Sequence, residues 1–198
     1  MRIIFATQNP GKLVEMKKML AGFDVLSAAE AGVLEDVEED GETFSANALK
    51  KARFVAAKTG EWAVADDSGL CIDALRGEPG VYTARWAHGR DLVEYTLECM
   101  KNILEGRRGA HFESAVAIVS PAGLEKIFTG VIRGELALAP RGQALPKLPY
   151  DVIFIPEGYK KTFAEMSEDE KNSLSHRGRA FRLMRAYLEK ISDQKKLA

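Results

Sequence analysis

Short apolar runs alternate with amphipathic stretches along the chain, and this pattern predicts an α/β protein with a mixed sheet. Residues 1–6 form an apolar run with β-branched members, which favours a buried strand, and residues 24–28 favour a second one. Apolar residues recur at the helical period in residues 13–20, 44–56 and 91–104. We expect helices there, the last of them ending near Gly106.

The second half of the chain adds a hairpin and a further strand. Residues 112–119 and 126–138 read as two strands, and the turn sequence S-P-A-G at 120–123 joins them. A Pro-rich loop over 139–149 then leads into an expected strand at 150–156. Long ordered loops are often functional, so this loop is a candidate part of a site.

Two helices are expected near the C-terminal end. Ser167 and Glu170 have the spacing of a capping box, which predicts a short helix. A longer helix is expected to begin near Ser175, and its first turn carries His176 and Arg177. Positive charge at a helix N-terminus opposes the macrodipole, so a ligand or an acidic partner would explain it. A solvated basic turn is the alternative.

One apolar run is interrupted by acids. Residues 62–65 read as a buried strand that continues into Asp66 and Asp67, and apolar residues resume at Leu70. Burying an unpaired carboxylate costs several kcal/mol, and such conflicts are expected mainly at functional sites. The sequence D-D-S-G is also good turn chemistry. The local pattern therefore leaves a site and a turn both open.

A polar loop follows the first expected strand. Residues 7–12 read T-Q-N-P-G-K and lead into a helical pattern, so backbone N–H groups and the positive end of a helix would face this loop. This arrangement suits a phosphate. A helix cap, with Thr7 or Asn9 at the N-cap and Pro10 in the first turn, is a compatible reading.

An acidic stretch over residues 35–42 precedes Thr43, which can cap the next helix. Most of these acids suit a solvated loop. The stretch could also bring a metal ligand close to Lys51 of that helix. Mg²⁺ characteristically takes one or two carboxylates together with substrate phosphates and waters.

Composition narrows the class of protein. The 198 residues are 46% hydrophobic and carry a formal net charge of −1, which gives no electrostatic case for nucleic acid or a membrane surface. Cys71 and Cys99 form no metal-binding pattern and are expected to be reduced, as in the cytoplasm. No segment approaches the ~18 consecutive apolar residues of a membrane span.

Several motifs occur in register over nearly the whole chain. They are T-Q-N-P-G-K at 7–12, A-D-D-S-G-L at 65–70, P-G-V-Y-T-A-R at 79–85, F-A-E-M-S-x-x-E-K-N at 163–172 and S-H-R-G-R-A at 175–180. From residue 3 to about residue 190 the sequence resembles the inosine triphosphate pyrophosphatase family, also called Ham1-like.

The resemblance implies a fold, an activity and partners. The fold would be a single α/β domain over residues 1–198, an elongated mixed β-sheet with flanking helices in which two lobes enclose a central nucleotide cleft. The activity would be Mg²⁺-dependent hydrolysis of ITP, dITP and XTP to the monophosphate and pyrophosphate, which sanitises the nucleotide pool. The family also implies a cytoplasmic homodimer that binds purine nucleoside triphosphate and neither nucleic acid nor membrane.

The resemblance also assigns roles to residues. Asp67 matches the general base and, with Glu39, the metal ligands. The remaining matches are substrate contacts, with the phosphates at 7–12 and near Lys51 and the base edge near His176 and Arg177. The full set is Thr7, Gln8, Asn9, Pro10, Gly11, Lys12, Lys51, Ser68, Leu148, Pro149, Tyr150, Asp151, Lys171, His176 and Arg177. Arg and His can donate to a 6-oxo group, whereas the 6-amino group of adenine is itself a donor.

One stretch departs from the family pattern. Family members usually carry Arg-Gly, a short spacer and Gly-Phe-Gly-Tyr-Asp-Pro, whereas residues 141–152 here read R-G-Q-A-L-P-K-L-P-Y-D-V. Leu148 stands where an aromatic residue is expected to stack on the purine, an interaction worth about 1–3 kcal/mol. We therefore expect weaker or altered base selectivity with the chemistry retained.

Two other functions compete with this one. The Maf-like nucleotide pyrophosphatases use similar chemistry on other nucleotides, and the pair of motifs S-H-R and T-x-N-P-G-K favours the first family over them. A non-catalytic nucleotide sensor, in which the altered loop has ended turnover, is the second alternative.

Overall fold

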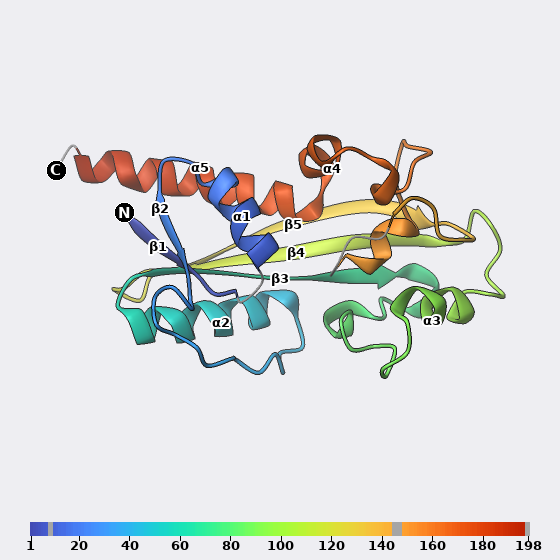
Figure 1. The fold of residues 1–198 in the computed structure, drawn as a ribbon, viewed down its shortest axis with the longest axis horizontal. Coiled ribbons are helices and arrows are strands. Elements are labelled where there is room, and N and C mark those ends of the chain that lie inside the picture. Colours follow the sequence, from blue (N-terminus) through green and yellow to red (C-terminus); the bar gives the residue numbers. More distant parts are fainter. Residues whose placement is uncertain (8–9, 144–147, 197–198) are drawn as a thin grey trace. The chain divides into compact units, whose positions relative to one another are not determined.

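The computed structural model describes residues 1–7, 10–143 and 148–196 (Figure 1). Six strands form one sheet in the order β2-β1-β3-β4-β5-β6. β1 pairs in parallel with β2 and β3, and β5 pairs antiparallel with β6, so the predicted mixed sheet is confirmed. The strands are β1 (Arg2–Phe5), β2 (Asp24–Ser27), β3 (Trp62–Ile72), β4 (Gly109–Val119), β5 (Glu125–Leu136) and β6 (Phe154–Pro156).

Five α-helices flank the strands in the part of the chain that the structure describes. They are α1 (Pro10–Met19), α2 (Phe44–Thr59), α3 (Leu92–Cys99), α4 (Glu168–Leu174) and α5 (His176–Lys196). Two predicted caps are confirmed: Thr43 caps α2 by accepting from the Ala46 N–H, and Ser167 and Glu170 form the capping box of α4. None of these described helices has the length and apolar character needed to cross a bilayer.

The chain divides into two compact units, and three strands and one helix contribute residues to both. The first unit comprises Met1–Asp67, Ser114–Thr129 and Arg179–Ala198, and the second comprises Ser68–Glu113 and Gly130–Gly178. Each unit has its own hydrophobic core.

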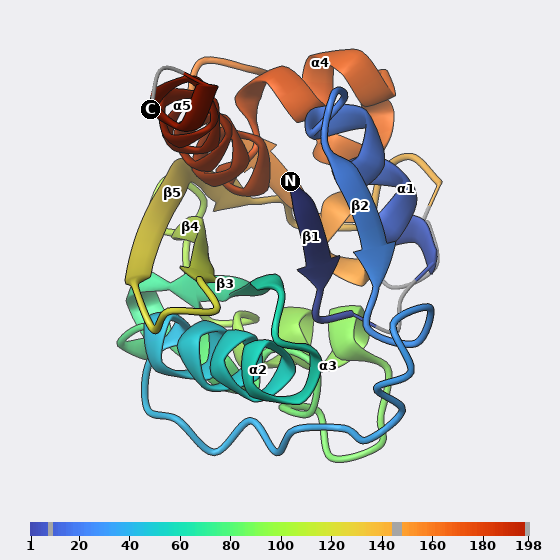
Figure 2. The same cartoon turned by 90° about the vertical axis from the view of Figure 1, so that its left-hand side faces the viewer.

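In the first unit, helices cover both faces of the strands (Figures 1 and 2). Ile3 and Phe5 of β1 pack into a core with α1 and α5, where the ring of Phe5 meets Phe181 edge to face at 6.1 Å. Side chains alternate along a strand, so Ile4 faces the other side, where α2 lies. The fully buried Ala48 and Ala52 let α2 approach the sheet closely.

In the second unit, aromatic rings form the centre of the core. Phe112 of β4 lies 4.7 Å from Phe154 of β6 and 6.1 Å from Phe163, measured between ring centroids. Phe163 belongs to a short 3₁₀ helix, Phe163–Glu165. These rings bury a large apolar area and favour specific tilted and stacked contacts.

Two sequence predictions about this unit are wrong. The helix expected to end near Gly106 ends at Cys99, and Tyr150 and Asp151 lie in a 3₁₀ helix, Pro149–Val152, rather than in a strand. Pro149 fixes its own φ and has no N–H to donate to a sheet, so the chain turns before β6 begins.

A buried arginine shortly after α3 contacts the carbonyls at its end. The buried guanidinium of Arg108 donates to the carbonyls of Met100 and Ile103, just beyond the helix, and to those of Leu136 and Ala137. A longer helix would have paired the first two carbonyls internally. Arg108 therefore replaces the last turn of the expected helix with contacts to β5.

We expect Arg108→Met to lower the free energy of unfolding by about 3 kcal/mol or more, because four carbonyls lose their charged donor. Urea denaturation followed by circular dichroism measures this loss. Arg107→Met is the matched control, since the neighbouring Arg107 is exposed and should change stability by about 0.5 kcal/mol or less. Equal effects of the two substitutions would contradict the role given to Arg108.

Candidate active site

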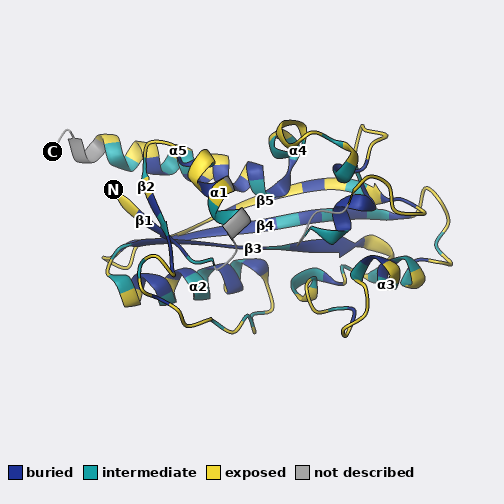
Figure 3. Cartoon of the chain, in the orientation of Figure 1, coloured by how far each residue is buried: buried dark blue, intermediate teal, exposed yellow. Residues whose placement is uncertain are grey.

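The stretch with two adjacent acids is a continuous strand. β3 runs without a break from Trp62 to Ile72 and is mostly buried (Figure 3). Asp66 and Asp67 are only 2% and 9% exposed. The turn that D-D-S-G allowed is therefore wrong. Consecutive side chains of a strand point to opposite faces, so the two carboxylates lie in different surroundings.

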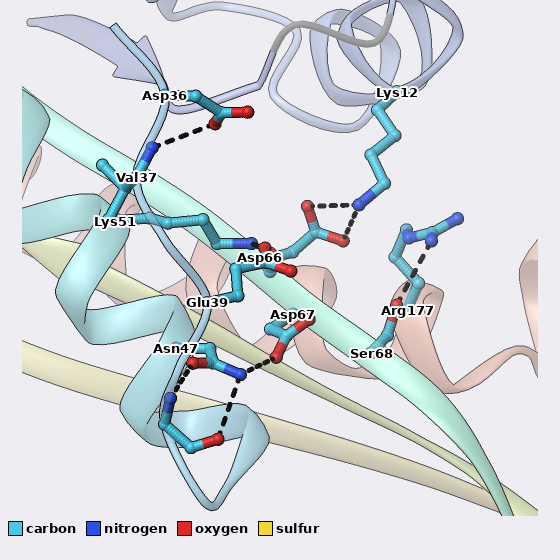
Figure 4. Close-up of polar contacts among 11 residues, drawn as sticks. Lys12, Asp36, Val37, Glu39, Asn47, Lys51, Asp66, Asp67, Ser68 and Arg177 are labelled. Atoms are coloured by element: carbon cyan, nitrogen blue, oxygen red, sulfur yellow. Dashed lines mark hydrogen bonds and ion pairs between the residues drawn. The ribbon is translucent and has the colours of Figure 1, made fainter. Parts of the chain in front are cut away.

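Asp66 is paired with a lysine from α1. Lys12 Nζ lies 3.0 Å from Oδ1 and 2.9 Å from Oδ2 of Asp66 (Figure 4). Lys12 belongs to α1, which already begins at Pro10, so the expected loop 7–12 is shorter than predicted. Pro10 in the first turn agrees with the helix-cap reading. Gln8 and Asn9 lie outside the described residues, and of Pro10 and Gly11 the structure describes only their place in the helix.

Asp67 faces α2. Its Oδ2 accepts a hydrogen bond of 3.0 Å from Asn47 Nδ2, and Asn47 is 1% exposed. Burial raises the pKa of Asp67 to about 6, although Lys51 and the Asn47 bond favour the charged form. A buried carboxyl with a raised pKa, held in a defined orientation, is suited to accept a proton near neutral pH.

Asn47 also fixes the acidic loop. Its Oδ1 accepts from the Gly41 N–H at 2.7 Å, and a Cβ at Gly41 would lie only 2.6 Å from that oxygen. No role for Asn47 was expected from the sequence. Its position three residues after Phe44, directly before Ala48, put an amide on the apolar face and was the signal available.

Lys51 joins the acidic loop to β3. Its Nζ donates to Glu39 Oε1 at 2.5 Å and to the carbonyl of Asp66 at 2.7 Å. Burial alone would lower the pKa of Lys51, but the carboxylates of Asp66, Asp67 and Glu39 raise it, so the ammonium stays charged. The structure thus brings Glu39 and Lys51 together, as the sequence suggested.

The residues present fit a divalent cation that is shared with a ligand. Glu39 lies close enough to Asp67 for the charge of one to raise the pKa of the other, and a cation would relieve that repulsion. Over the described ranges, no three or more His, Cys, Asp or Glu side chains are arranged to hold a metal. Mg²⁺ needs only one or two carboxylates when substrate phosphates and waters complete its shell.

In the second unit, the expected substrate residues form two pairs and a stack. Arg177 Nη2 lies 3.4 Å from Ser68 Oγ, and Lys171 forms an ion pair with Asp151. Burial raises the pKa of Asp151, and Lys171 opposes that shift. The ring of His176 stacks on Phe112 with the centroids 4.8 Å apart and the planes at 11°.

The segment from Leu148 to Asp151 is anchored by the buried side chain of Tyr150. Leu148 and Pro149 are half-buried, whereas Tyr150 is 3% exposed and its hydroxyl donates to the carbonyl of Thr83 at 3.2 Å. Sequence reasoning singled out the motif P-G-V-Y-T-A-R without giving Thr83 a task. No local signal connects Thr83 with a residue 67 positions further along the chain.

Comparison with known proteins places the chain in a family. The profile of the Ham1 family matches residues 3–187. A Streptomyces coelicolor protein named dITP/XTP pyrophosphatase is 44% identical over 191 residues, covering 92% of this chain and 94% of that protein. A Bacillus subtilis protein of the same name is 43% identical over 192 residues, covering 94% and 96%.

Solved structures of Ham1 proteins also resemble the fold of this chain. A HAM1 protein from Coxiella burnetii matches with a TM-score of 0.88 and 36% identity, over 96% of this chain and 99% of that one. The resemblance inferred from the motifs is confirmed: this chain belongs to the Ham1 family.

Proposed function

We propose that this protein hydrolyses non-canonical purine nucleoside triphosphates, namely ITP, dITP and XTP, to the monophosphate and pyrophosphate. The observation that carries the proposal is Asp67, a buried carboxyl with a pKa of about 6 beside Glu39 and Lys51. The relatives named dITP/XTP pyrophosphatase match along nearly their full length and support the same substrates.

In this proposal Glu39 and Asp67 hold Mg²⁺. The bound ion would neutralise the charge that develops on the phosphates as the α-β bond breaks. Lys12, Lys51 and the N-terminal end of α1 bind phosphate oxygens. Lys12 exchanges part of its contact with Asp66 for the phosphate, so Asp66 keeps this lysine in place before the substrate arrives.

Asp67 acts as the general base. Its pKa of about 6 makes it mostly ionised at neutral pH, so it can orient the attacking water and accept its proton. Asn47 holds the carboxyl in one orientation through Oδ2. Water attack on the α-phosphorus then releases pyrophosphate as the leaving group.

The residues that the family resemblance assigns to the base all belong to the second unit. Ser68, Lys171, His176 and Arg177 supply donors, and a 6-oxo purine offers an acceptor where adenine offers a donor. Asp151 and the half-buried Leu148 and Pro149 complete the proposed set of base-binding residues. The homodimer and the cytoplasmic location remain predictions of the same proposal.

A panel of nucleoside triphosphates tests the activity. We expect Mg²⁺-dependent pyrophosphate release from XTP, dITP and ITP, with only moderate preference over GTP and ATP because Leu148 stands where an aromatic would stack. A coupled pyrophosphate assay measures kcat/KM for each. Binding without product would indicate a sensor, a preference for pyrimidine substrates would indicate Maf-like specificity, and strong purine discrimination would contradict the role given to Leu148.

Asp67→Asn should abolish turnover and stabilise the metal-free protein. A carboxyl whose pKa is raised from 3.8 to about 6 is stabilising when protonated, so this contribution is lost as pH rises from about 4 to 6. The difference corresponds to at most about 3 kcal/mol at neutral pH. Denaturation in EDTA at several pH values should show that the free energy of unfolding of the variant increases relative to that of wild type as pH rises from about 4 to 6.

Asp73→Asn provides a control, since the Asp73 side chain is 56% exposed and its substitution should change stability by about 0.5 kcal/mol or less. Near-wild-type turnover by Asp67→Asn would remove Asp67 as the base. A stability difference that does not vary between pH 4 and 6 would show that the carboxyl is not protonated more readily in the folded state.

A further inference from the structure

Past its first residues, β3 relies on partners other than β1. β1 pairs only with Trp62–Val64 of β3. Further along, the Leu70 N–H donates to Thr83 Oγ1 at 2.9 Å, and the Ile72 N–H donates to the carbonyl of Glu78 at 3.0 Å. A side-chain hydroxyl therefore serves as the acceptor for a backbone donor of the strand, two residues after Ser68.

Thr83 is fixed by four hydrogen bonds, one of which runs from its own N–H to the carbonyl of Gly80 at 3.1 Å. Its hydroxyl donates to the carbonyl of Gly80 at 2.6 Å, so the oxygen is left to accept from the Leu70 N–H. Its own carbonyl accepts from the Tyr150 hydroxyl at 3.2 Å. One residue thus connects the strand that carries Ser68 with the 3₁₀ helix Pro149–Val152.

The side chain of Tyr150 is buried and bonded within the protein. It is 3% exposed and packs in the core of the second unit. Burial raises its pKa to about 12, so the phenol remains a donor under all physiological conditions. Its chain neighbour Asp151 forms the ion pair with Lys171.

We propose that Thr83 is a positioning residue for nucleobase recognition. It acts through Tyr150 to hold the segment Leu148–Asp151 in a fixed position relative to Ser68. The inference rests on the proposed function and deepens it. Thr83 belongs to the second unit, whereas Asp67, Glu39 and Lys51 belong to the first, so its loss should weaken binding of the base and leave the chemical step intact.

Two substitutions, each of which removes one hydroxyl group, test whether Thr83 positions the segment Leu148–Asp151. Tyr150→Phe removes the donor to Thr83, and Thr83→Val removes the hydroxyl that accepts from Leu70. A hydrogen bond of ordinary net strength corresponds to about five- to tenfold in an equilibrium. We expect KM for XTP and dITP to rise by about that factor, kcat to change by about twofold or less, and the preference over GTP to fall.

Thr83→Ser is the conservative variant and should restore KM to within about twofold of wild type, because it keeps the hydroxyl. Tyr82→Phe is the matched control for Tyr150→Phe, since Tyr82 is 54% exposed and should leave KM and kcat unchanged. Thermal unfolding confirms that each variant is folded. If Thr83→Val does not fold, Tyr150→Phe, which loses one atom, decides the test.

The outcomes separate this inference from the proposed function. If wild type releases pyrophosphate but Tyr150→Phe and Thr83→Val keep its KM, or lose kcat on all substrates alike, Thr83 does not position the base site. If wild type has no turnover, the proposed function fails, and calorimetric titration with inosine monophosphate tests Thr83 instead. Equal affinity of wild type and variants, or no binding by wild type, then overturns the inference.

Discussion

Two neighbouring carboxylates inside a buried strand are the constraint on which the first unit depends. Asp66 and Asp67 leave β3 on opposite faces, so each carboxylate is held by a hydrogen-bond partner of its own. α1 supplies Lys12 to Asp66, and α2 supplies Asn47 to Asp67. Because isolated buried charge is so costly, the positions of both helices are tied to the chemistry of the strand as well as to its apolar packing.

The same constraint makes the site reactive. Burial raises the pKa of Asp67 to about 6, and the nearby charges of Glu39 and Asp66 add to that shift while Lys51 opposes it, so a cation beside Asp67 would be stabilised. A fold optimised only for stability would replace such a group by an apolar residue. Retaining it fits the general observation that active sites break local rules and are less stable for it.

Local signals carried the predictions that were confirmed. The first strand, the Thr43 cap and the capping box of α4 each depend on residues within a few positions of one another. Two of the predictions that were wrong depend on side chains outside the local pattern, whereas the expected strand at 150–156 was shortened by the adjacent Pro149. Nothing near residues 100–103 announces that Arg108 will take their carbonyls, and D-D-S-G reads as a turn until Lys12 and Asn47 are placed beside it. For the site, the motifs supplied residue types, while the pairing of Lys12 with Asp66 and the role of Thr83 required the tertiary structure.

Arg108 has a further consequence for how the second unit moves. Its acceptors belong to two segments, one at Met100 and Ile103 and the other at Leu136 and Ala137. Neither segment can open without withdrawing carbonyls from the same buried cation, so their fluctuations are coupled. Backbone amides around α3 and the end of β5 should therefore exchange with solvent deuterium as one cooperative unit rather than fraying separately.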